Sequence, residues 1–193
     1  MRFAVQIFLL VFFFFCVIKT SVFANDATIT PAQTMEKNSS QSAIVQYNLA
    51  FPGILPDNPL YKLKVLRDKL TLGLINDPLK KIEFYLLSTD KGILATAILV
   101  DKKNISLAKE TALKAENNYT LLTHELYNLP KKPGNDFFKK LQTASLKHQQ
   151  VLSSLAKRVS KDDKKTFDQV IDFSKRNWSS VEEYRSKKHI IKL

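Results

Sequence analysis

Apolar residues recur at intervals of three and four positions through five segments of this 193-residue chain, with polar residues between them. This spacing predicts amphipathic α-helices, because residues three and four apart share one helix face. The first two helices are expected to begin at Asn58 and Asp77, each a polar cap followed by proline. Asp136 opens the fourth helix, and a polar turn at Ser160 precedes the fifth. No segment alternates with the period of two that a strand requires, so the predicted fold is all-α.

The expected arrangement is a bundle of about five helices, a three-helix unit followed by a C-terminal helical hairpin. The second helix carries apolar residues on two neighbouring faces, so it should lie at the centre with Leu86 buried. In the third helix, Ala108, Ala112 and Ala115 would allow close approach to the second. The proline-rich stretch before the first helix should run extended, leaving Phe51 free to pack as an anchor. The apolar face of the first helix comprises Leu60, Leu63, Leu66 and Leu70.

The N-terminal residues have the three parts of a secretion signal. Arg2 supplies a positive charge, a nearly unbroken apolar run extends from Phe3 to Ile18, and small or compact residues end at Ala24. We expect cleavage after Ala24 and an extracytoplasmic protein that is secreted or associated with the cell envelope. The alternative is an uncleaved signal that stays as a membrane anchor on the same side. Cleavage would also remove Cys16, the only cysteine, so disulfides would not contribute to stability.

Composition divides the rest of the chain into further segments. Residues 25–46 are rich in Thr, Ser, Ala, Gln and Asn, which predicts a flexible linker. Residues 47–129 contain the proline-rich motif and the three-helix unit. Residues 130–135 contain two prolines and a glycine and are predicted to be a second linker. Residues 136–193 then form the basic helical hairpin.

The formal net charge of +12 is concentrated near the C-terminus. Residues 25–130 contain 12 basic and 11 acidic residues, whereas residues 131–193 contain 16 basic and 7 acidic ones. This asymmetry predicts a polyanionic partner, for which the extracytoplasmic candidates are anionic envelope polymers, lipid headgroups and extracellular nucleic acid. The alternative is a solvated cationic surface that serves only solubility. The residues predicted to bind a polyanion are Lys139, Lys140, Lys147, Lys157, Arg158, Lys164, Lys165, Arg185, Lys187 and Lys188.

The run from Pro52 to Tyr61 reads Pro-Gly-Ile-Leu-Pro-Asp-Asn-Pro-Leu-Tyr and precedes a helix rich in Lys and Leu. In this motif and in the helices that follow, the chain resembles a bacterial family of exported proteins known only as a domain of unknown function. The resemblance covers residues 47–126, with a later match near Lys147. It implies a secreted or envelope-associated helical domain and offers no catalytic residues to transfer. Family members carry an Arg-containing patch midway along the second helix, of which this chain retains only Asp90 and Lys91.

The remaining polar residues do not predict catalysis, a cofactor or a metal site. His124 begins the pattern of a zinc-protease helix, but Asn128 stands where the second histidine is required. His148 lies on an apolar stripe and is expected to be a partly buried residue with one hydrogen bond. The adjacent acids Asp162 and Asp163 point to different sides of a helix and cannot form a catalytic dyad. We therefore do not expect an enzyme.

Two functional hypotheses follow. The leading one is a non-enzymatic exported binding or structural module of the bacterial cell envelope that contacts a polyanion through its basic C-terminal helices. The alternative is a protein-interaction or chaperone-like helical module that uses apolar edges of the second and third helices. Binding that weakens steeply as salt increases would distinguish the first from the second.

Overall fold

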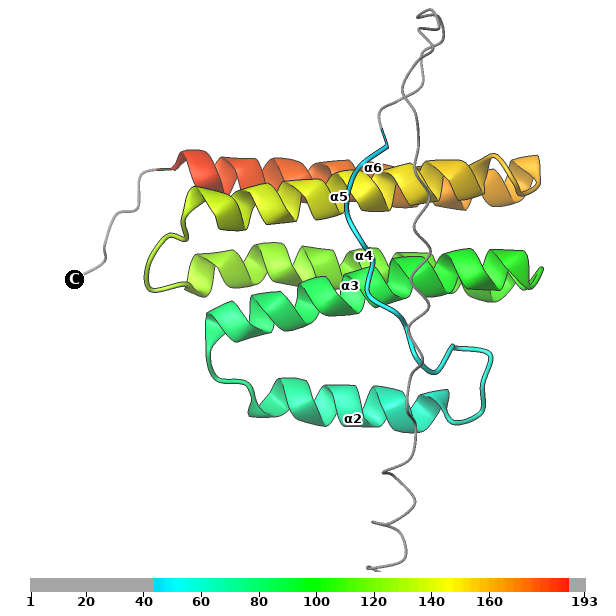
Figure 1. Ribbon diagram of the computed structural model, residues 1–193, viewed down its shortest axis with the longest axis horizontal. Coiled ribbons are helices and arrows are strands. Elements are labelled where there is room, and N and C mark those ends of the chain that lie inside the picture. The colour runs from blue at the N-terminus through cyan, green and yellow to red at the C-terminus, as the bar shows by residue number, and fades with distance from the viewer. Residues whose placement is uncertain (1–43, 188–193) are drawn as a thin grey trace, which may run out of the picture. The chain divides into compact units, whose positions relative to one another are not determined.

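The computed structural model describes residues 44–187, which belong to a compact unit running from Gln41 to Leu193. The predicted secretion signal, its cleavage site, most of the first linker and Lys188 lie outside the described residues. The described residues form five α-helices and one short 3-10 helix, with no β-strand among them, which confirms the predicted all-α fold. The elements are α2 (Tyr61–Leu74), α3 (Pro78–Asp101), α4 (Ile105–Glu125), η1 (Leu126–Asn128), α5 (Asn135–Ala156) and α6 (Lys161–Ser186) (Figure 1).

Four of the helices, α3 to α6, form a bundle with a shared core. Helix α3 packs against α4 and α5 packs against α6, and the two pairs meet through α4 with α6 and α3 with α5 (Figure 1). The expected C-terminal hairpin is therefore present as α5 and α6, and its core is continuous with that of α3 and α4. Leu86 is 5% exposed and lies in this core, as predicted for the second helix.

Capping side chains fix the starts of two helices where the sequence predicts them. Asp77 accepts a hydrogen bond from the N–H of Leu79 at 2.9 Å and so satisfies a donor that the helix itself leaves free. Ser160 accepts from the N–H of Asp163 at 3.2 Å in the same way. Local sequence is sufficient for these boundaries because cap and helix interact within three residues.

The proline-rich motif forms a turn that delays the first helix. Asn58 accepts a hydrogen bond from the N–H of Leu60 at 2.9 Å, so its side chain stabilises a turn. Helix α2 consequently begins at Tyr61 and not at Asn58, which corrects the predicted start. The ammonium group of Lys64 donates to the carbonyl of Pro52 at 3.0 Å and joins the motif to α2.

Small residues bring α3 and α4 close together. Ala108, Ala112 and Ala115 are at most 2% exposed, as their spacing predicts. A Cβ atom added at Gly92 of α3 would lie only 2.6 Å from the Cβ of Ala115. The absence of a side chain at Gly92 therefore permits this helix–helix contact.

Helix α2 lies outside the bundle core and contributes no buried residue (Figure 1). Its half-buried residues include Tyr61, Val65 and Leu72, which share one side of the helix. The leucine face expected to pack in the bundle is on the opposite side and is exposed. Among the helices between residues 44 and 187, none has both the length and the apolarity needed to cross a membrane.

Residues 44–51 form an extended segment across the bundle, which we call the N-terminal strap (Figure 1). The hydroxyl of Tyr47 donates to a carboxylate oxygen of Asp90 at 2.7 Å, and the ammonium of Lys147 donates to the carbonyl of Val45 at 3.2 Å. The sequence predicts that Phe51 packs as an anchor, but it is 74% exposed, so that prediction is wrong. Tyr47 is the anchor instead, because it combines an apolar ring with a hydroxyl that reaches a buried acceptor.

Candidate functional site

A layer of polar side chains divides the core of the bundle into two apolar clusters. One cluster contains Leu86 and Tyr119, and the other contains Ile93 and Leu152. Every helix of the bundle contributes to the layer between them, so we call it the polar layer. It consists of Thr89, Asp90, Glu116, Ser145, His148, Ser174 and Asn177, all of them buried.

Asp90 is the acceptor at one side of the polar layer. His148 Nε2 donates to Asp90 Oδ1 at 2.7 Å, and the Tyr47 hydroxyl donates to Oδ2 at the same distance. Partial burial and the neighbouring carboxylate both raise the pKa of Tyr47, so this phenol stays a donor at physiological pH. The single hydrogen bond predicted for His148 is present, but the side chain is fully buried, not partly.

Glu116 is the second carboxyl group of the layer. Asn177 Nδ2 donates to Glu116 Oε1 at 2.9 Å, whereas Oε2 has no hydrogen-bond partner among the described residues. Burial raises the pKa of Glu116 because a carboxylate loses its hydration there, and the amide of Asn177, His148 and the hydroxyl of Ser174 oppose that shift. Glu116 therefore keeps its proton to a higher pH than a carboxyl group in water does.

The carboxyl groups of the polar layer connect helices, since each accepts a hydrogen bond from a side chain of a different helix. Asp90 of α3 meets His148 of α5, and Glu116 of α4 meets Asn177 of α6. The described residues contain no group of three His, Cys, Asp or Glu arranged to hold a metal ion. We interpret the layer as structural, because its bonded groups join helices inside the core, while Glu116 Oε2 and His148 Nδ1 have no partner among the described residues.

Basic side chains gather where α5 begins and α6 ends, and we call this region the basic end. The ammonium of Lys132 donates to the backbone carbonyls of Arg185 and Lys187, the latter at 3.0 Å, so the segment before α5 meets the C-terminal end of α6 there. The guanidinium carbon of Arg185 also lies 5.8 Å from the ring centre of Phe138 on α5. The basic end comprises Lys131, Lys132, Lys139, Lys140, Arg185 and Lys187.

The predicted polyanion-binding residues differ in whether they already have an acidic or backbone partner. Lys139, Lys140 and Lys157 are exposed and form no ion pair with any residue between 44 and 187. Lys147 is half-buried and bonded to the strap, so it is a structural contact. The remaining described residues are paired: Arg158 with Asp101, Lys164 with Asp168, Lys165 with Asp162, Arg185 with Glu182 and Lys187 with Glu183.

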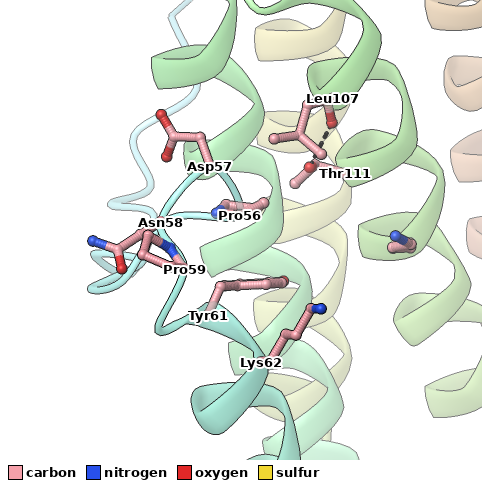
Figure 2. Close-up of a pocket in the computed structure, with 9 residues that line it drawn as sticks. Pro56, Asp57, Asn58, Pro59, Tyr61, Lys62, Leu107 and Thr111 are labelled. Atoms are coloured by element: carbon pink, nitrogen blue, oxygen red, sulfur yellow. Dashed lines mark hydrogen bonds between the residues drawn. The ribbon is translucent and has the colours of Figure 1, made fainter.

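A hollow of about 380 Å³ lies where the proline-rich motif meets α4 (Figure 2). Tyr61 lines it on the motif side, and Leu107 and Thr111 line it on the helix side. Two of its polar groups already have partners: Asp57 lies 2.8 Å from the ammonium of Lys102, and the Thr111 hydroxyl donates to the Leu107 carbonyl at 2.7 Å. We therefore regard the basic end as the better candidate site.

The protein is a small all-α domain whose four-helix bundle is crossed by the N-terminal strap and flanked by α2. The chain matches the family described as a domain of unknown function, DUF5667, over residues 53–162. This is more than half of its length, so the chain belongs to that family. The match includes α2 to α5 but ends at the start of α6. No curated protein and no solved structure matches the chain.

Proposed function

We propose that this chain is an exported, non-enzymatic binding or structural module of the bacterial cell envelope, and that it contacts an anionic envelope polymer through its basic C-terminal helices. The observation that carries the proposal is the exposure of Lys139, Lys140 and Lys157 without an acidic partner in the described part of the chain. Two of these three lysines belong to the basic end.

The ion pairs of the neighbouring cations support the same proposal. Arg185 pairs with Glu182 at 3.3 Å and Lys187 with Glu183 at 2.6 Å, and all four side chains are 40% or more exposed. Exposed pairs of this kind stabilise a protein by about 0–1 kcal/mol, because water and salt compete with them. A phosphate- or carboxylate-rich polymer can therefore replace the acidic partners at little cost.

The test is titration of residues 25–193 with fluorescently labelled inorganic polyphosphate, followed by fluorescence anisotropy at several salt concentrations. We expect log K to fall linearly with log salt, because binding releases counterions from the polymer. Lys139→Gln with Lys140→Gln should weaken binding and reduce the salt slope by about one to two. The matched control is Lys164→Gln with Lys165→Gln, which removes the same charge from ion-paired positions and should have a smaller effect. Equal losses in the two variants, or binding that salt does not change, would refute the proposal.

The alternative is a protein-interaction module that uses apolar edges of α3 and α4. Leu79 and Leu87 on α3 are 39% and 42% exposed, and Leu113 and Leu121 on α4 are both 38% exposed. Partial exposure of single leucines is ordinary for a protein surface. The polyanion proposal is therefore the better supported one, and salt-tolerant capture of unfolded polypeptides would favour the alternative.

Export is the second part of the proposal and rests on the N-terminal sequence. The apolar run from Phe3 to Ile18 and the compact residues ending at Ala24 predict cleavage at that point. Intact mass and N-terminal sequencing of the protein from a bacterial secretion host should show Asn25 as the first residue. A mature product that still begins at Met1 would instead support the retained anchor.

A further inference from the structure

Helix α2 carries a leucine face that the rest of the described chain leaves uncovered. The five leucines of this face, four in α2 and one at its N-cap, are each between 55% and 82% exposed, although leucines spaced by three and four normally mark a face that packs. Tyr61, Val65 and Leu72 on the other side of the helix are half-buried, so the leucine face points away from the bundle. The leucine face consists of Leu60, Leu63, Leu66, Leu70 and Leu74.

Basic side chains flank this face along both edges. At about 100° of rotation per residue, Lys62 and Lys69 follow one edge, and Arg67, which pairs with Asp68 at 2.7 Å, lies at the other. Lys64 is half-buried and turns away to the Pro52 carbonyl. The helix contains these four basic residues and one acidic residue, Asp68. An apolar face bordered by cations is typical of helices that lie in the surface of an anionic membrane.

Two other occupants of the face fit less well. A second copy of α2 would bring another set of flanking cations beside the first, and neighbouring like charges on packed helices repel each other. Insertion across a bilayer is excluded by length, since 14 residues of α-helix extend about 21 Å and a hydrocarbon core is about 30 Å thick. An anionic lipid surface, in contrast, receives the leucines among its acyl chains and the cations at its phosphates.

We propose that α2 is a membrane-surface helix, which lies parallel to an anionic bilayer with its leucine face inserted and its flanking cations at the lipid phosphates. This surface is separate from the basic end and does not depend on the polyanion proposal. It gives the protein a lipid contact of its own after a secretion signal is removed.

The experiment is co-flotation of residues 25–193 with unilamellar vesicles. This chain keeps the whole compact unit that begins at Gln41. We expect binding to phosphatidylcholine vesicles that contain about one-third phosphatidylglycerol, and weaker binding to phosphatidylcholine alone or at high salt. Leu66→Ser with Leu70→Ser should lower the partition coefficient about tenfold or more, because each change removes an inserting side chain. The control, Leu121→Ser with Leu146→Ser, alters exposed leucines of the bundle and should bind like the parent.

A second readout places the helix in the bilayer. The chain has no cysteine after Cys16, so Leu74→Cys provides a single attachment point for an environment-sensitive fluorophore. Its emission should shift to the blue on anionic vesicles, whereas a label at Leu146→Cys should not shift. Circular dichroism should show unchanged helicity in all variants, because the substituted leucines are exposed.

Three results would overturn the proposal. They are absence of flotation at low salt, equal flotation of the two double-serine variants, and a soluble dimer that Leu66→Ser with Leu70→Ser converts to a monomer. The last result would assign the leucine face to a second copy of the chain. Lys139→Gln with Lys140→Gln should leave flotation largely unchanged, so failure of this proposal and failure of the polyanion proposal are distinguishable.

Discussion

Glu116→Gln is expected to stabilise the protein at neutral and higher pH. Glu116 is 1% exposed, and Oε2 has no hydrogen-bond partner among the described residues. Glutamine has nearly the same shape, keeps the oxygen that accepts from Asn177, and places an amide group near the hydroxyl of Ser174. The substitution therefore removes a charge that burial opposes without opening a cavity.

The sign of the pH dependence follows from the raised pKa of Glu116. Folding favours the protonated acid, so stability is fully present below the ordinary carboxyl value of 4.5 and is lost as pH rises through the raised pKa of the folded state. Each unit of elevation corresponds to about 1.4 kcal/mol. An unpaired buried polar group costs about 1–3 kcal/mol. We expect Glu116→Gln to increase the free energy of unfolding by about 1–3 kcal/mol at pH 8 and by much less at pH 4.

The assay is urea denaturation of parent and variant between pH 4 and pH 9, followed by circular dichroism. The difference between their unfolding free energies should grow with pH. Groups that titrate identically in both proteins cancel when the two free energies are subtracted. Glu110→Gln is the matched control on the same helix, because its side chain is 59% exposed and pairs with the exposed Lys114. It should change stability by less than about 0.5 kcal/mol at any pH. A difference for Glu116→Gln that stays constant across this range, or a loss of stability at pH 8, would refute the reasoning.

Three further substitutions test the core. Leu86→Asp buries an unpaired charge at the centre of the bundle, so circular dichroism should show loss of the folded helices. Gly92→Ala should cost about 1–2 kcal/mol in urea denaturation, because its Cβ would overlap Ala115; combined with Ala115→Gly, it should cost less than the two single losses added together. Tyr47→Phe removes one donor from buried Asp90 and should cost about 1–3 kcal/mol, with faster proteolysis of the strap as a second readout.

Much of the fold is accessible from sequence because it depends on local rules. The caps Asp77 and Ser160 interact with residues only two or three positions away, so their helices begin as predicted. The buried stripe of α4 follows the spacing of Ala108, Ala112 and Ala115, which also predicts its close contact with α3. Periodicity decides which side chains share a face, and in the bundle helices that face is the buried one.

Periodicity does not decide what covers a face. Leu63, Leu66 and Leu70 of α2 have the same spacing as the buried stripes of the bundle, yet they are 64%, 55% and 62% exposed. Four helices already enclose the core, so a fifth amphipathic helix has no interior position left. The cations that flank these leucines are a sequence signal for a membrane-surface helix. That signal can be interpreted only once the structure shows that the leucine face is uncovered.

The polar layer escaped sequence reasoning for a different reason. In sequence, Asp90 reads as an interruption of an apolar stripe, and its partners His148 and Tyr47 are 58 and 43 residues away. Glu116 lies four residues after Ala112 and three before Tyr119, which places it on the buried stripe of α4. A carboxyl group at such a position is a usable signal, because buried acids need partners from other elements.

The same layer explains how one register is selected among several that apolar packing would tolerate. Leucine and alanine stripes on four helices can slide by one turn, about 5.4 Å, and still bury apolar area. Such a shift would separate Asp90 from His148 and Glu116 from Asn177, so each buried carboxyl group would lose its hydrogen bond to another helix. A buried polar contact often contributes little stability in itself while it disfavours alternative packings. Glu116 contributes to this selection through Oε1, which Asn177 reaches only in the observed register. A gain of stability in Glu116→Gln would show that this contact selects the register at a cost in stability.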